Sequence, residues 1–276
     1  MKKPIVILGI GELGSVFSRA FLKNNYPVYP ITRQTNIDEL ANTISPEFIL
    51  VCTAEADLQN ALQSIPKQWK DRVVMMQNEL LPRDWQMHNF TNPTVISVWF
   101  EKKKGMDSKV LISSPAYGKK AQILVDSLAL IDIPAHILNS EKALLFELVL
   151  KNLYILTTNI AGLAIEKGAT VDDLYNQYLD LMHDVSNDVL KLQSTLTGKT
   201  FSESDLEQGM IKAFQGDLKH KSMGISSPTR LKRALELAKT FNLPMPTLEN
   251  IANQTLLTLS LTFNKNFIQY VFFTSK

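Results

Sequence analysis

Cysteine, glycine and proline are all scarce in this sequence, and neither sign of charge dominates it. Its 276 residues include one cysteine (Cys52), 11 glycines and 12 prolines. A single cysteine excludes an intramolecular disulfide framework and a zinc site built from several cysteines, and it suits a reducing compartment. The low glycine and proline content excludes collagen-like and low-complexity chains. With 29 basic and 27 acidic residues the net charge is +2, which favours neither nucleic acid nor an anionic membrane as a partner.

Long hydrophobic runs are also rare. The apolar run at the start of the chain stops at Gly9, short of the roughly 7–15 residues that the core of a signal peptide needs. The most apolar stretch, residues 143–165, contains four polar side chains that are costly in lipid: Glu147, Lys151, Asn152 and Asn159. We therefore expect a soluble, cytoplasmic protein without a membrane-spanning segment.

The first half of the chain alternates between short apolar runs and helical patterns. Strands are predicted over 4–8, 28–32, 48–53, 72–77, 94–100 and 110–113, with helices between them, for example over 15–24 and 119–130. Short buried strands separated by helices of this length imply βαβ units. The sequence therefore predicts an α/β fold with a doubly wound parallel sheet and helices on both faces.

From Ser140 onward the periodicity is helical and almost no strand pattern remains. One long helix is predicted over 140–167, with Ser140 as its N-cap and Gly168 after its last turn. Further helices are predicted over 171–196, 203–219, 227–241 and 246–261. The chain is thus predicted to consist of an α/β domain at 1–138 and an all-α domain at 139–276. An apolar tail at 267–273 is expected to pack on a domain or to add to a dimer interface.

A glycine-rich turn directly follows the first predicted strand. The segment Gly9-Ile10-Gly11-Glu12-Leu13-Gly14 matches G-x-G-x-x-G at a strand-to-helix junction, where a dinucleotide site requires it. Gly9 permits the tight turn, Gly11 lets the backbone approach a pyrophosphate, and Gly14 lets the helix pack on the strand. The free amides and the helix dipole favour phosphate charge. The first domain is therefore predicted to be Rossmann-like and to bind a dinucleotide; the alternative is a glycine-rich turn without a ligand.

The end of the second predicted strand indicates which dinucleotide is bound. NAD-binding domains usually carry Asp or Glu there, where the carboxylate binds the ribose hydroxyls. Here the strand is followed by Arg33, and the first acid is Asp38. A guanidinium can bind a 2′-phosphate through two N–H groups. The cofactor is therefore predicted to be NADP(H), the alternative being that Arg33 is a solvated surface residue.

Taken together, these motifs resemble those of the ketopantoate reductase (2-dehydropantoate 2-reductase) family, of which the chain looks like a divergent member. The resemblance rests on the G-x-G-x-x-G turn, on Arg33, on the pair Gln77-Asn78 after the fourth strand, and on a long helix that carries Lys151. It covers most of the chain and is best in the first half. It implies an oxidoreductase that uses NADPH to reduce a small 2-oxo acid, 2-dehydropantoate, to pantoate in the biosynthesis of pantothenate and coenzyme A.

The resemblance also implies a role for particular residues. Lys151 would be the catalytic residue, and Asn159 and Ser222 would bind the substrate. The cofactor would be bound by the glycine-rich turn from Gly9 to Gly14, Arg33, Thr53 and Asn78. Partners other than the small substrate are not implied, apart from a second copy of the chain in a homodimer, which the sequence leaves open.

The chain departs from the family's pattern at several positions. Glu79 stands where a glycine follows Asn78 in the family, and this is expected to alter the turn. The lysine that follows the third strand is absent, because Thr53-Ala54-Glu55 stands there. Ile155 replaces an asparagine of the catalytic helix, and the acidic segment that follows Ser222 in the family is missing. These differences affect the expected substrate site more than the cofactor site.

Elementary helix geometry supports a role for Lys151. Residues four apart share a helix face, so Glu147, Lys151, Ile155 and Asn159 lie along one stripe between apolar flanks. A partly desolvated ammonium can donate a proton to an alkoxide as a hydride arrives. The alternative is a structural ion pair between Glu147 and Lys151. Since no two of the four histidines are spaced by four residues, no His-Glu-x-x-His metal site is expected, and His220 is kept as a reserve acid.

Two alternatives to a ketopantoate reductase remain open from the sequence. One is a hydroxyacid dehydrogenase of the 6-phosphogluconate or hydroxyisobutyrate type, which also joins a Rossmann half to helices and uses a lysine. The other is a non-catalytic NADP(H) sensor, which the absent lysine after the third strand and Ile155 would suit.

Overall fold

The computed structural model of the chain describes residues 2–255, which form two compact units. The sheet unit contains the residues up to Asn152 together with Ser204–Gly216, and the helical unit contains Leu153–Glu203 and the described residues from Asp217 on. The predicted domain boundary at 138/139 matches the end of the sheet, but the compact units divide at Asn152, inside a helix. The difference arises because the first half of that helix packs on the sheet unit.

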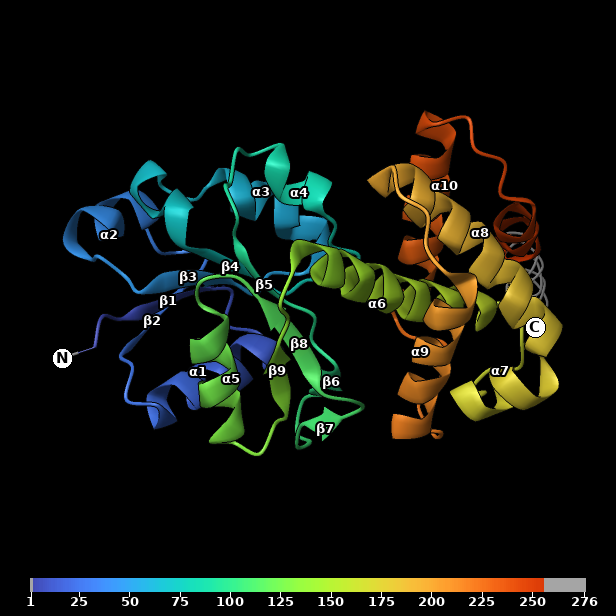
Figure 1. Cartoon of the computed structure of the whole chain (residues 1–276), viewed down its shortest axis with the longest axis horizontal. Helices are drawn as coiled ribbons and strands as arrows, with labels where there is room; N and C mark the ends of the chain where they lie inside the picture. The colour runs from blue at the N-terminus through green and yellow to red at the C-terminus, as the bar shows by residue number, and fades with distance from the viewer. Residues whose placement is uncertain (1, 256–276) are drawn as a thin grey trace, which may run out of the picture. The chain divides into compact units, whose positions relative to one another are not determined.

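A seven-stranded sheet in the order β2-β1-β3-β4-β5-β8-β9 forms the centre of the sheet unit (Figure 1). Its strands are β1 (Ile5–Leu8), β2 (Val28–Ile31), β3 (Phe48–Val51), β4 (Val73–Met75), β5 (Thr94–Ile96), β8 (Ser114–Tyr117) and β9 (Ala135–Ile137). The strands from β1 to β5 are parallel, which confirms the predicted βαβ units. Because β1 lies between β2 and β3, the carboxyl ends of β1 and β3 form a topological switch point, where doubly wound sheets bind ligands.

Helices cover both faces of this sheet. Figure 1 shows α1 (Glu12–Lys23) and α5 (Ala121–Ala129) on one face, and α2 (Ile37–Thr43), α3 (Leu58–Gln63) and α4 (Pro82–Gln86) on the other. Two short 3₁₀ helices, η1 (Glu55–Asp57) and η2 (Lys67–Arg72), flank α3. The helical spacing of Val16, Phe17, Ala20 and Phe21 gives α1 its apolar face, which is buried in one core cluster with Ile5 and Ile7 of β1.

The predictions for the last strands are partly wrong. The sheet is not wholly parallel, because β8 runs antiparallel to β5. The chain leaves β5 through a short antiparallel hairpin of β6 (Phe100–Glu101) and β7 (Lys109–Val110), and it returns without a crossover helix. The strand predicted over 94–100 therefore stops at Ile96. Of the strand predicted over 110–113 only Val110 is in a strand, β7, and β8 begins just after the predicted range, at Ser114. The sequence did not predict β9, since two of its three residues are exposed and show no apolar pattern.

Two long helices contain the points at which the chain passes from one unit to the other. α6 (Glu141–Ala161) begins in the sheet unit and continues into the helical unit, and nearly all of α9 (Glu203–Gly216) belongs to the sheet unit. Ser140 accepts a hydrogen bond from the Ala143 backbone N–H at 3.2 Å, as expected of the predicted N-cap. α6 ends six residues earlier than predicted, one residue before Gly162. A Cβ at Gly162 would lie 2.8 Å from the backbone nitrogen of Met223, so the glycine makes room for that segment.

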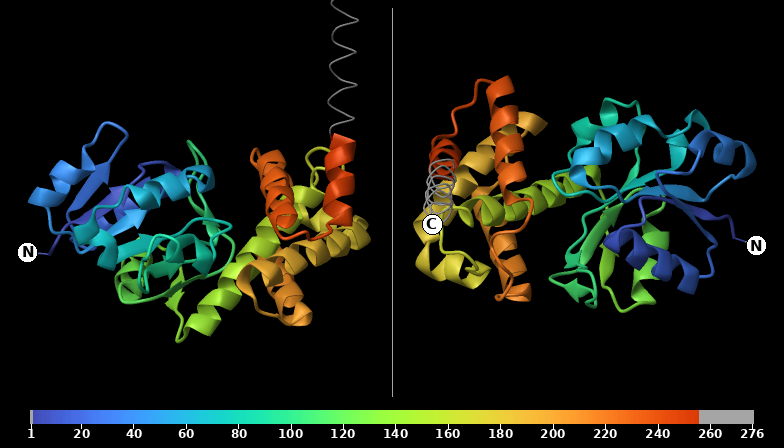
Figure 2. Two further views of the ribbon diagram at one scale, coloured as in Figure 1. Left: turned by 90° about the horizontal axis from the view of Figure 1, so that it is seen from above. Right: turned by 180° about the vertical axis from the view of Figure 1, so that it is seen from behind.

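The helical unit is built from helices alone. Besides the end of α6 it contains α7 (Val171–Gln177), α8 (Leu179–Thr197), α10 (Ser227–Thr240) and the helical residues 246–255. α8 packs against both α7 and α10 (Figure 2). The helix predicted over 171–196 is in fact interrupted at Tyr178, which separates α7 from α8. The end of the helix predicted over 246–261 and the apolar tail at 267–273 lie outside the described residues.

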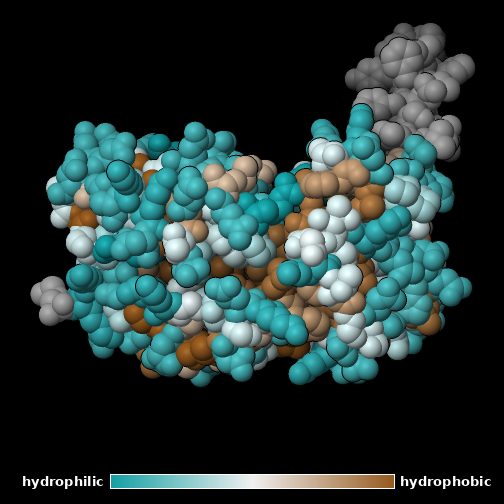
Figure 3. Space-filling model, turned by 45° about the horizontal axis from the view of Figure 1, so that its top comes forward, coloured by the Kyte–Doolittle hydropathy of each residue, from teal (hydrophilic) through white to brown (hydrophobic). Residues whose placement is uncertain are grey.

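Among residues 2–255, α6 is the one helix long and apolar enough to cross a membrane. However, 72% of its most apolar window is buried within the protein, as is typical of the core helix of a soluble protein. In the view of Figure 3, hydrophilic residues cover most of the surface of the sheet unit. Both observations agree with the expectation that α6 is no membrane span.

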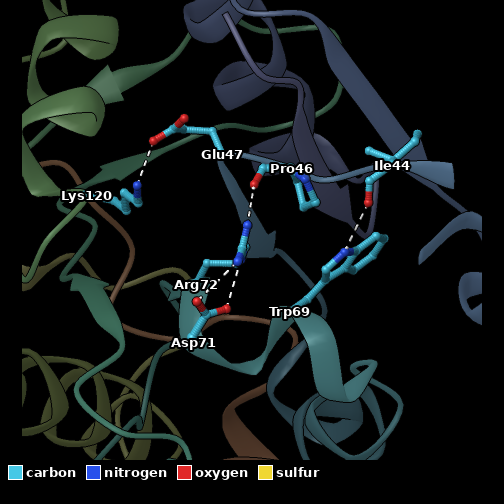
Figure 4. Close-up of polar contacts among 7 residues, drawn as sticks. All are labelled: Ile44, Pro46, Glu47, Trp69, Asp71, Arg72 and Lys120. Carbon is cyan, nitrogen blue, oxygen red and sulfur yellow. Dashed lines mark hydrogen bonds and ion pairs between the residues drawn. The ribbon is translucent and has the colours of Figure 1, made fainter. Parts of the chain in front are cut away.

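Polar contacts brace the amino edge of the sheet, where β3 begins (Figure 4). Three of them hold the segment before β3: Trp69 Nε1 donates to Ile44 O at 3.3 Å, Arg72 Nη1 donates to Pro46 O at 3.1 Å, and Lys120 Nζ contacts Glu47 Oε1 at 2.6 Å. Asp71 binds the Arg72 guanidinium through both carboxylate oxygens, and the hydrogen bond lowers the pKa of Asp71. These contacts fix the start of β3, at the edge opposite the glycine-rich turn.

We expect Arg72→Met to lower the free energy of unfolding by about 1 kcal/mol, because the bond to the Pro46 carbonyl is lost. Urea unfolding measures the change, with Lys67→Met, an exposed residue of the same 3₁₀ helix, as the control. Dinucleotide affinity should be unaffected, since these contacts lie at the edge of the sheet opposite the glycine-rich turn. An Arg72→Met protein as stable as the wild type would show that the Arg72–Pro46 hydrogen bond does not contribute to the free energy of unfolding.

Candidate active site

The turn from Gly9 to Gly14 joins β1 to α1 at the switch point. Gly9 has a φ of 99°, and a Cβ there would lie 3.0 Å from the backbone of Cys52. A Cβ at Gly14 would lie 2.3 Å from the Gly9 carbonyl oxygen. The fold itself therefore requires the two outer glycines. At Gly11, by contrast, a Cβ would meet no atom within 4 Å, and its φ of −82° suits any residue.

The remaining residues of the turn differ in exposure. Ile10 is 43% exposed, Leu13 packs against the core cluster, and Glu12 lies in the first turn of α1. Glu12 Oε2 lies 3.6 Å from the ammonium of Lys102, which follows β6. The open space beside Gly11 thus adjoins the amides of the α1 N-terminus and one ion pair. Such an arrangement can bind a phosphate group.

The loop after β3 lies against the glycine-rich turn. A Cβ at Gly9 would lie 3.2 Å from the Thr53 nitrogen. Thr53 Oγ1 is buried and has no hydrogen-bond partner among the described residues. Because an unpaired buried hydroxyl is costly, it marks a place where a ligand atom would fit. The neighbouring Cys52 packs against the core cluster, and burial raises the pKa of its thiol.

Arg33 lies in the turn between β2 and α2. Hydrogen bonds shape this turn: the Thr35 N–H donates to Thr32 O, and the Thr32 N–H donates to Thr35 Oγ1, both at 3.1 Å. Arg33 is exposed, and no described residue forms a hydrogen bond or ion pair with it. Asp38 belongs to the first turn of α2, which Asn36 caps. No acid therefore stands directly at the end of β2, and the choice of NADP(H) stays a prediction.

Asn78 follows β4 at the same carboxyl edge of the sheet. Its Nδ2 donates to Glu55 Oε1 at 2.9 Å, so the loops after β3 and β4 are joined there. Gln77 turns inward and donates to the Val51 carbonyl at 2.7 Å. Glu79 has a φ of 62°, the left-handed conformation for which glycine is the usual residue. The backbone at Glu79 thus has a conformation typical of glycine, and whether the turn differs from that of the family stays a prediction.

Lys151 is brought to this carboxyl edge by α6. Its ammonium lies 4.2 Å from the centroid of the Trp99 ring, and the residue is only 9% exposed. Trp99 follows β5 and is fully buried. The next residue, Asn152, donates to the carbonyl of Leu80, which lies between β4 and α4, at 3.4 Å. A cation over an indole face is stabilised by about 2 kcal/mol when desolvated, so the position of Lys151 is well determined.

The structural alternative for Lys151 is not observed. Glu147 lies one turn before Lys151 on α6. Among the described residues, no basic side chain lies within ion-pair distance of its carboxylate. Burial raises the pKa of Glu147, and the charge of Lys212 opposes this shift. The Trp99 ring is thus one of the groups that contact the ammonium of Lys151, and Glu147 does not form the ion pair considered from the sequence.

Asn159 and Ser222 lie in the helical unit. Asn159 Oδ1 accepts hydrogen bonds from Ser227 Oγ and Arg230 Nη1, both at 2.9 Å. Its Nδ2 makes one long bond of 3.4 Å to Thr158 Oγ1. Ser222 Oγ donates to the Ala169 carbonyl at 2.8 Å, and the side chain is buried. The side-chain oxygen of Asn159 thus points toward Arg230. Ser222 joins its own loop to the segment at Ala169 through its hydrogen bond.

His220, the reserve acid, also lies in the helical unit. Its Nδ1 is 3.9 Å from Asp217 Oδ2, and its carbonyl accepts a hydrogen bond from the Val171 N–H. These contacts hold the loop between α9 and α10.

In each unit, some residues that contact the candidate residues were not found from the sequence. They are Trp99, which holds Lys151; Glu55, which holds Asn78; Arg230 and Ser227, which hold Asn159; and Lys102, which contacts Glu12. All of these contacts join segments distant in sequence, and no local pattern indicates them. The Thr53-Ala54-Glu55 segment departs from the family's pattern, but the sequence did not indicate that Glu55 accepts a hydrogen bond from Asn78.

No protein-family model matches the sequence, and no curated protein matches it either. Solved structures do match its fold. The 2-dehydropantoate 2-reductase of Methylococcus capsulatus matches with a TM-score of 0.63 at 12% identity, covering 93% of this chain and 97% of that one. A D-mandelate dehydrogenase in complex with NADH matches with a TM-score of 0.60 at 14% identity, covering 94% and 98%. The dimeric ketopantoate reductase of Staphylococcus aureus matches with a TM-score of 0.60 at 13% identity, covering 92% and 98%.

At such low identity these matches show the fold. The chain has the two-part fold of the ketopantoate reductases, a Rossmann-like sheet followed by helices, along nearly its whole length. The fold expected from the sequence is thereby confirmed.

Proposed function

We propose that this chain, which has the fold of the ketopantoate reductases, is a divergent member of that family that uses NADPH to reduce a small 2-oxo acid. Its first candidate substrate is 2-dehydropantoate, which would place it in the biosynthesis of pantothenate and coenzyme A. D-mandelate dehydrogenase shares the fold, so an aryl 2-oxo acid is the second candidate.

One observation carries this proposal: the buried ammonium of Lys151 lies at the edge of the sheet where the glycine-rich turn also lies. A proton donor and a dinucleotide-binding turn at one edge are the two parts that carbonyl reduction needs. Without a catalytic role, a lysine with so little exposure is uncommon in a protein core.

The residues of the edge fit a dinucleotide. Gly11 leaves open space beside the α1 amides, Thr53 Oγ1 is a buried hydroxyl without a partner in the described part of the chain, and Arg33 is exposed beyond β2. Glycine amides and the helix dipole would hold the pyrophosphate, and Arg33 the 2′-phosphate. Asn78, fastened by Glu55, would lie at the nicotinamide end.

When bound, NADPH supplies a hydride to the carbonyl carbon of the substrate. The electron pair of the carbonyl bond moves to the oxygen, and Lys151 donates its ammonium proton there, which gives the 2-hydroxy acid. Water then returns a proton to the lysine. Asn159, whose oxygen is engaged by Arg230 and Ser227, would act on the substrate as an amide donor. Ser222 is proposed as a second substrate contact.

Steady-state oxidation of NADPH by the purified full chain tests the proposal. The panel contains 2-dehydropantoate, an aryl 2-oxo acid and a branched aliphatic one, with NADP⁺ and hydroxyacids in the reverse direction. Turnover with any 2-oxo acid supports a reductase, and turnover only with 6-phosphogluconate or hydroxyisobutyrate supports the other dehydrogenase class. NADPH binding without turnover of any of these compounds contradicts the proposal and supports a sensor.

Cofactor preference gives a sharper test. We expect NADPH to bind more tightly than NADH by about 1–3 kcal/mol, since one charged contact to the 2′-phosphate dominates the difference. Arg33→Ala should remove this preference by weakening NADPH and leaving NADH unchanged. Arg19→Ala, an exposed arginine on α1, is the control and should change neither affinity. Equal affinities of the wild type for NADPH and NADH, or an unchanged preference in Arg33→Ala, would show that Arg33 does not bind the 2′-phosphate.

The S. aureus enzyme with this fold is dimeric, and we propose a homodimer here as well. Sedimentation of the full chain distinguishes dimer from monomer. We also propose a cytoplasmic location, because a single cysteine suits a reducing compartment.

A further inference from the structure

Acidic side chains gather at the carboxyl edge of the sheet. Glu12 lies in the first turn of α1, Glu55 and Asp57 follow β3, and Glu79 follows β4. A dinucleotide with a 2′-phosphate would bring several more negative charges to this edge. A carboxylate placed beside phosphates opposes their binding unless a cation neutralises it. Glu12 is the acid that stands within the glycine-rich turn itself.

Lys102 is the cation that reaches Glu12. Its Nζ lies 3.6 Å from Glu12 Oε2, and only 20% of its side chain is exposed. The same ammonium donates to the backbone oxygens of Lys103 and Met106, so it is held in place from its own loop as well. Across residues 2–255, no other basic side chain lies within ion-pair distance of the Glu12 carboxylate.

Buried packing holds Lys102 near the glycine-rich turn. Phe100, two residues earlier in β6, lies with its ring centroid 6.0 Å from that of Phe17 on α1. Both rings belong to the core cluster of the sheet unit. The hairpin is further joined to the β5 side by a 2.8 Å bond from the Leu111 N–H to the Trp99 carbonyl. The Glu12–Lys102 contact therefore does not depend on two flexible surface side chains meeting by chance.

We propose that Lys102 is an affinity-determining residue of the dinucleotide site, which neutralises Glu12 beside the pyrophosphate. The β6–β7 hairpin would then be a third part of the site, together with the loops after β1 and β3. This inference rests on the proposed function, because it requires a dinucleotide at the glycine-rich turn. It adds a residue, far from the glycine-rich turn in sequence, that no motif of this chain assigns to cofactor binding.

The test compares NADPH affinity in the full chain, measured by titration calorimetry, for Lys102→Gln, Glu12→Gln and the double variant. Glutamine removes the charge of Lys102 and keeps a hydrogen-bond donor for its loop. We expect Lys102→Gln to weaken NADPH about tenfold at low salt, and less at high salt, because exposed charges are screened. Glu12→Gln should bind at least as tightly as the wild type, and the double variant should bind like Glu12→Gln. Lys103→Gln is the control, since Lys103 pairs with Glu101 at 3.1 Å.

Two results would overturn the inference. One is wild-type NADPH affinity in Lys102→Gln. The other is a double variant as weak as Lys102→Gln, because Lys102 would then act independently of Glu12. Urea unfolding of each variant separates a loss of charge from a loss of folding. If the wild type itself fails to bind NADPH, the proposed function fails; if the wild type binds and Lys102→Gln is neutral, only this inference fails.

Discussion

Lys151→Met should lower kcat by about 10²–10⁴ with the best 2-oxo acid, because it removes the proposed general acid. Methionine keeps the length and the apolar stem of the lysine, so it can still pack on the Trp99 ring. The affinity for NADPH should change little, since Lys151 is not among the proposed phosphate contacts. Stopped-flow measurement of NADPH oxidation gives kcat, and a separate titration gives the cofactor affinity.

Two further variants separate proton donation from charge and from packing. Lys151→Arg keeps a cation over Trp99 but holds its proton too tightly to donate it, so it should also be slow. Lys142→Met changes an exposed lysine near the start of the same helix and should be as fast as the wild type. If Lys151→Met turned over at the wild-type rate, Lys151 would be structural, and His220 would be the next acid to test.

Gly11→Val should abolish dinucleotide binding and leave the protein folded. The structure makes this separation sharp, because a Cβ at Gly11 meets no protein atom within 4 Å and the backbone there suits any residue. The added side chain would instead occupy the approach of the pyrophosphate to the α1 amides. Calorimetric titration with NADPH measures the loss, and urea unfolding should show wild-type stability.

Gly14→Ala provides the contrast. Its Cβ would lie 2.3 Å from the Gly9 carbonyl oxygen, so we expect this smaller substitution to destabilise the fold itself. A folded Gly11→Val protein that still binds NADPH as the wild type does would place the ligand elsewhere on the molecule. Such a result would contradict the proposed cofactor site.

The glycine-rich turn and the strands around it could be predicted because their signals are local. The first 24 residues form a buried strand, a turn and a helix. The spacing of apolar residues indicates the strand and the helix, and the glycines indicate the turn between them. The positions of Arg33 and Asn78 could be predicted for the same reason, since each lies within three residues of the end of a strand, while their roles stay predictions. The antiparallel β8 could not, because its direction depends on where the chain re-enters the sheet after the β6–β7 hairpin.

The sequence by itself determined that a doubly wound sheet begins the chain, that helices complete it, and that Gly11 and Arg33 lie in the loops after its first two strands. Only the tertiary structure decided what surrounds the polar side chains. It placed Lys151 over Trp99 and not beside Glu147, joined Asn78 to Glu55, and brought Lys102 to Glu12. The physical reason is that periodicity reports which face of an element is buried, while the partner across a contact comes from a distant segment. Residues 12 and 102 are 90 positions apart in the sequence, and the packing of Phe100 on Phe17 is what brings them together.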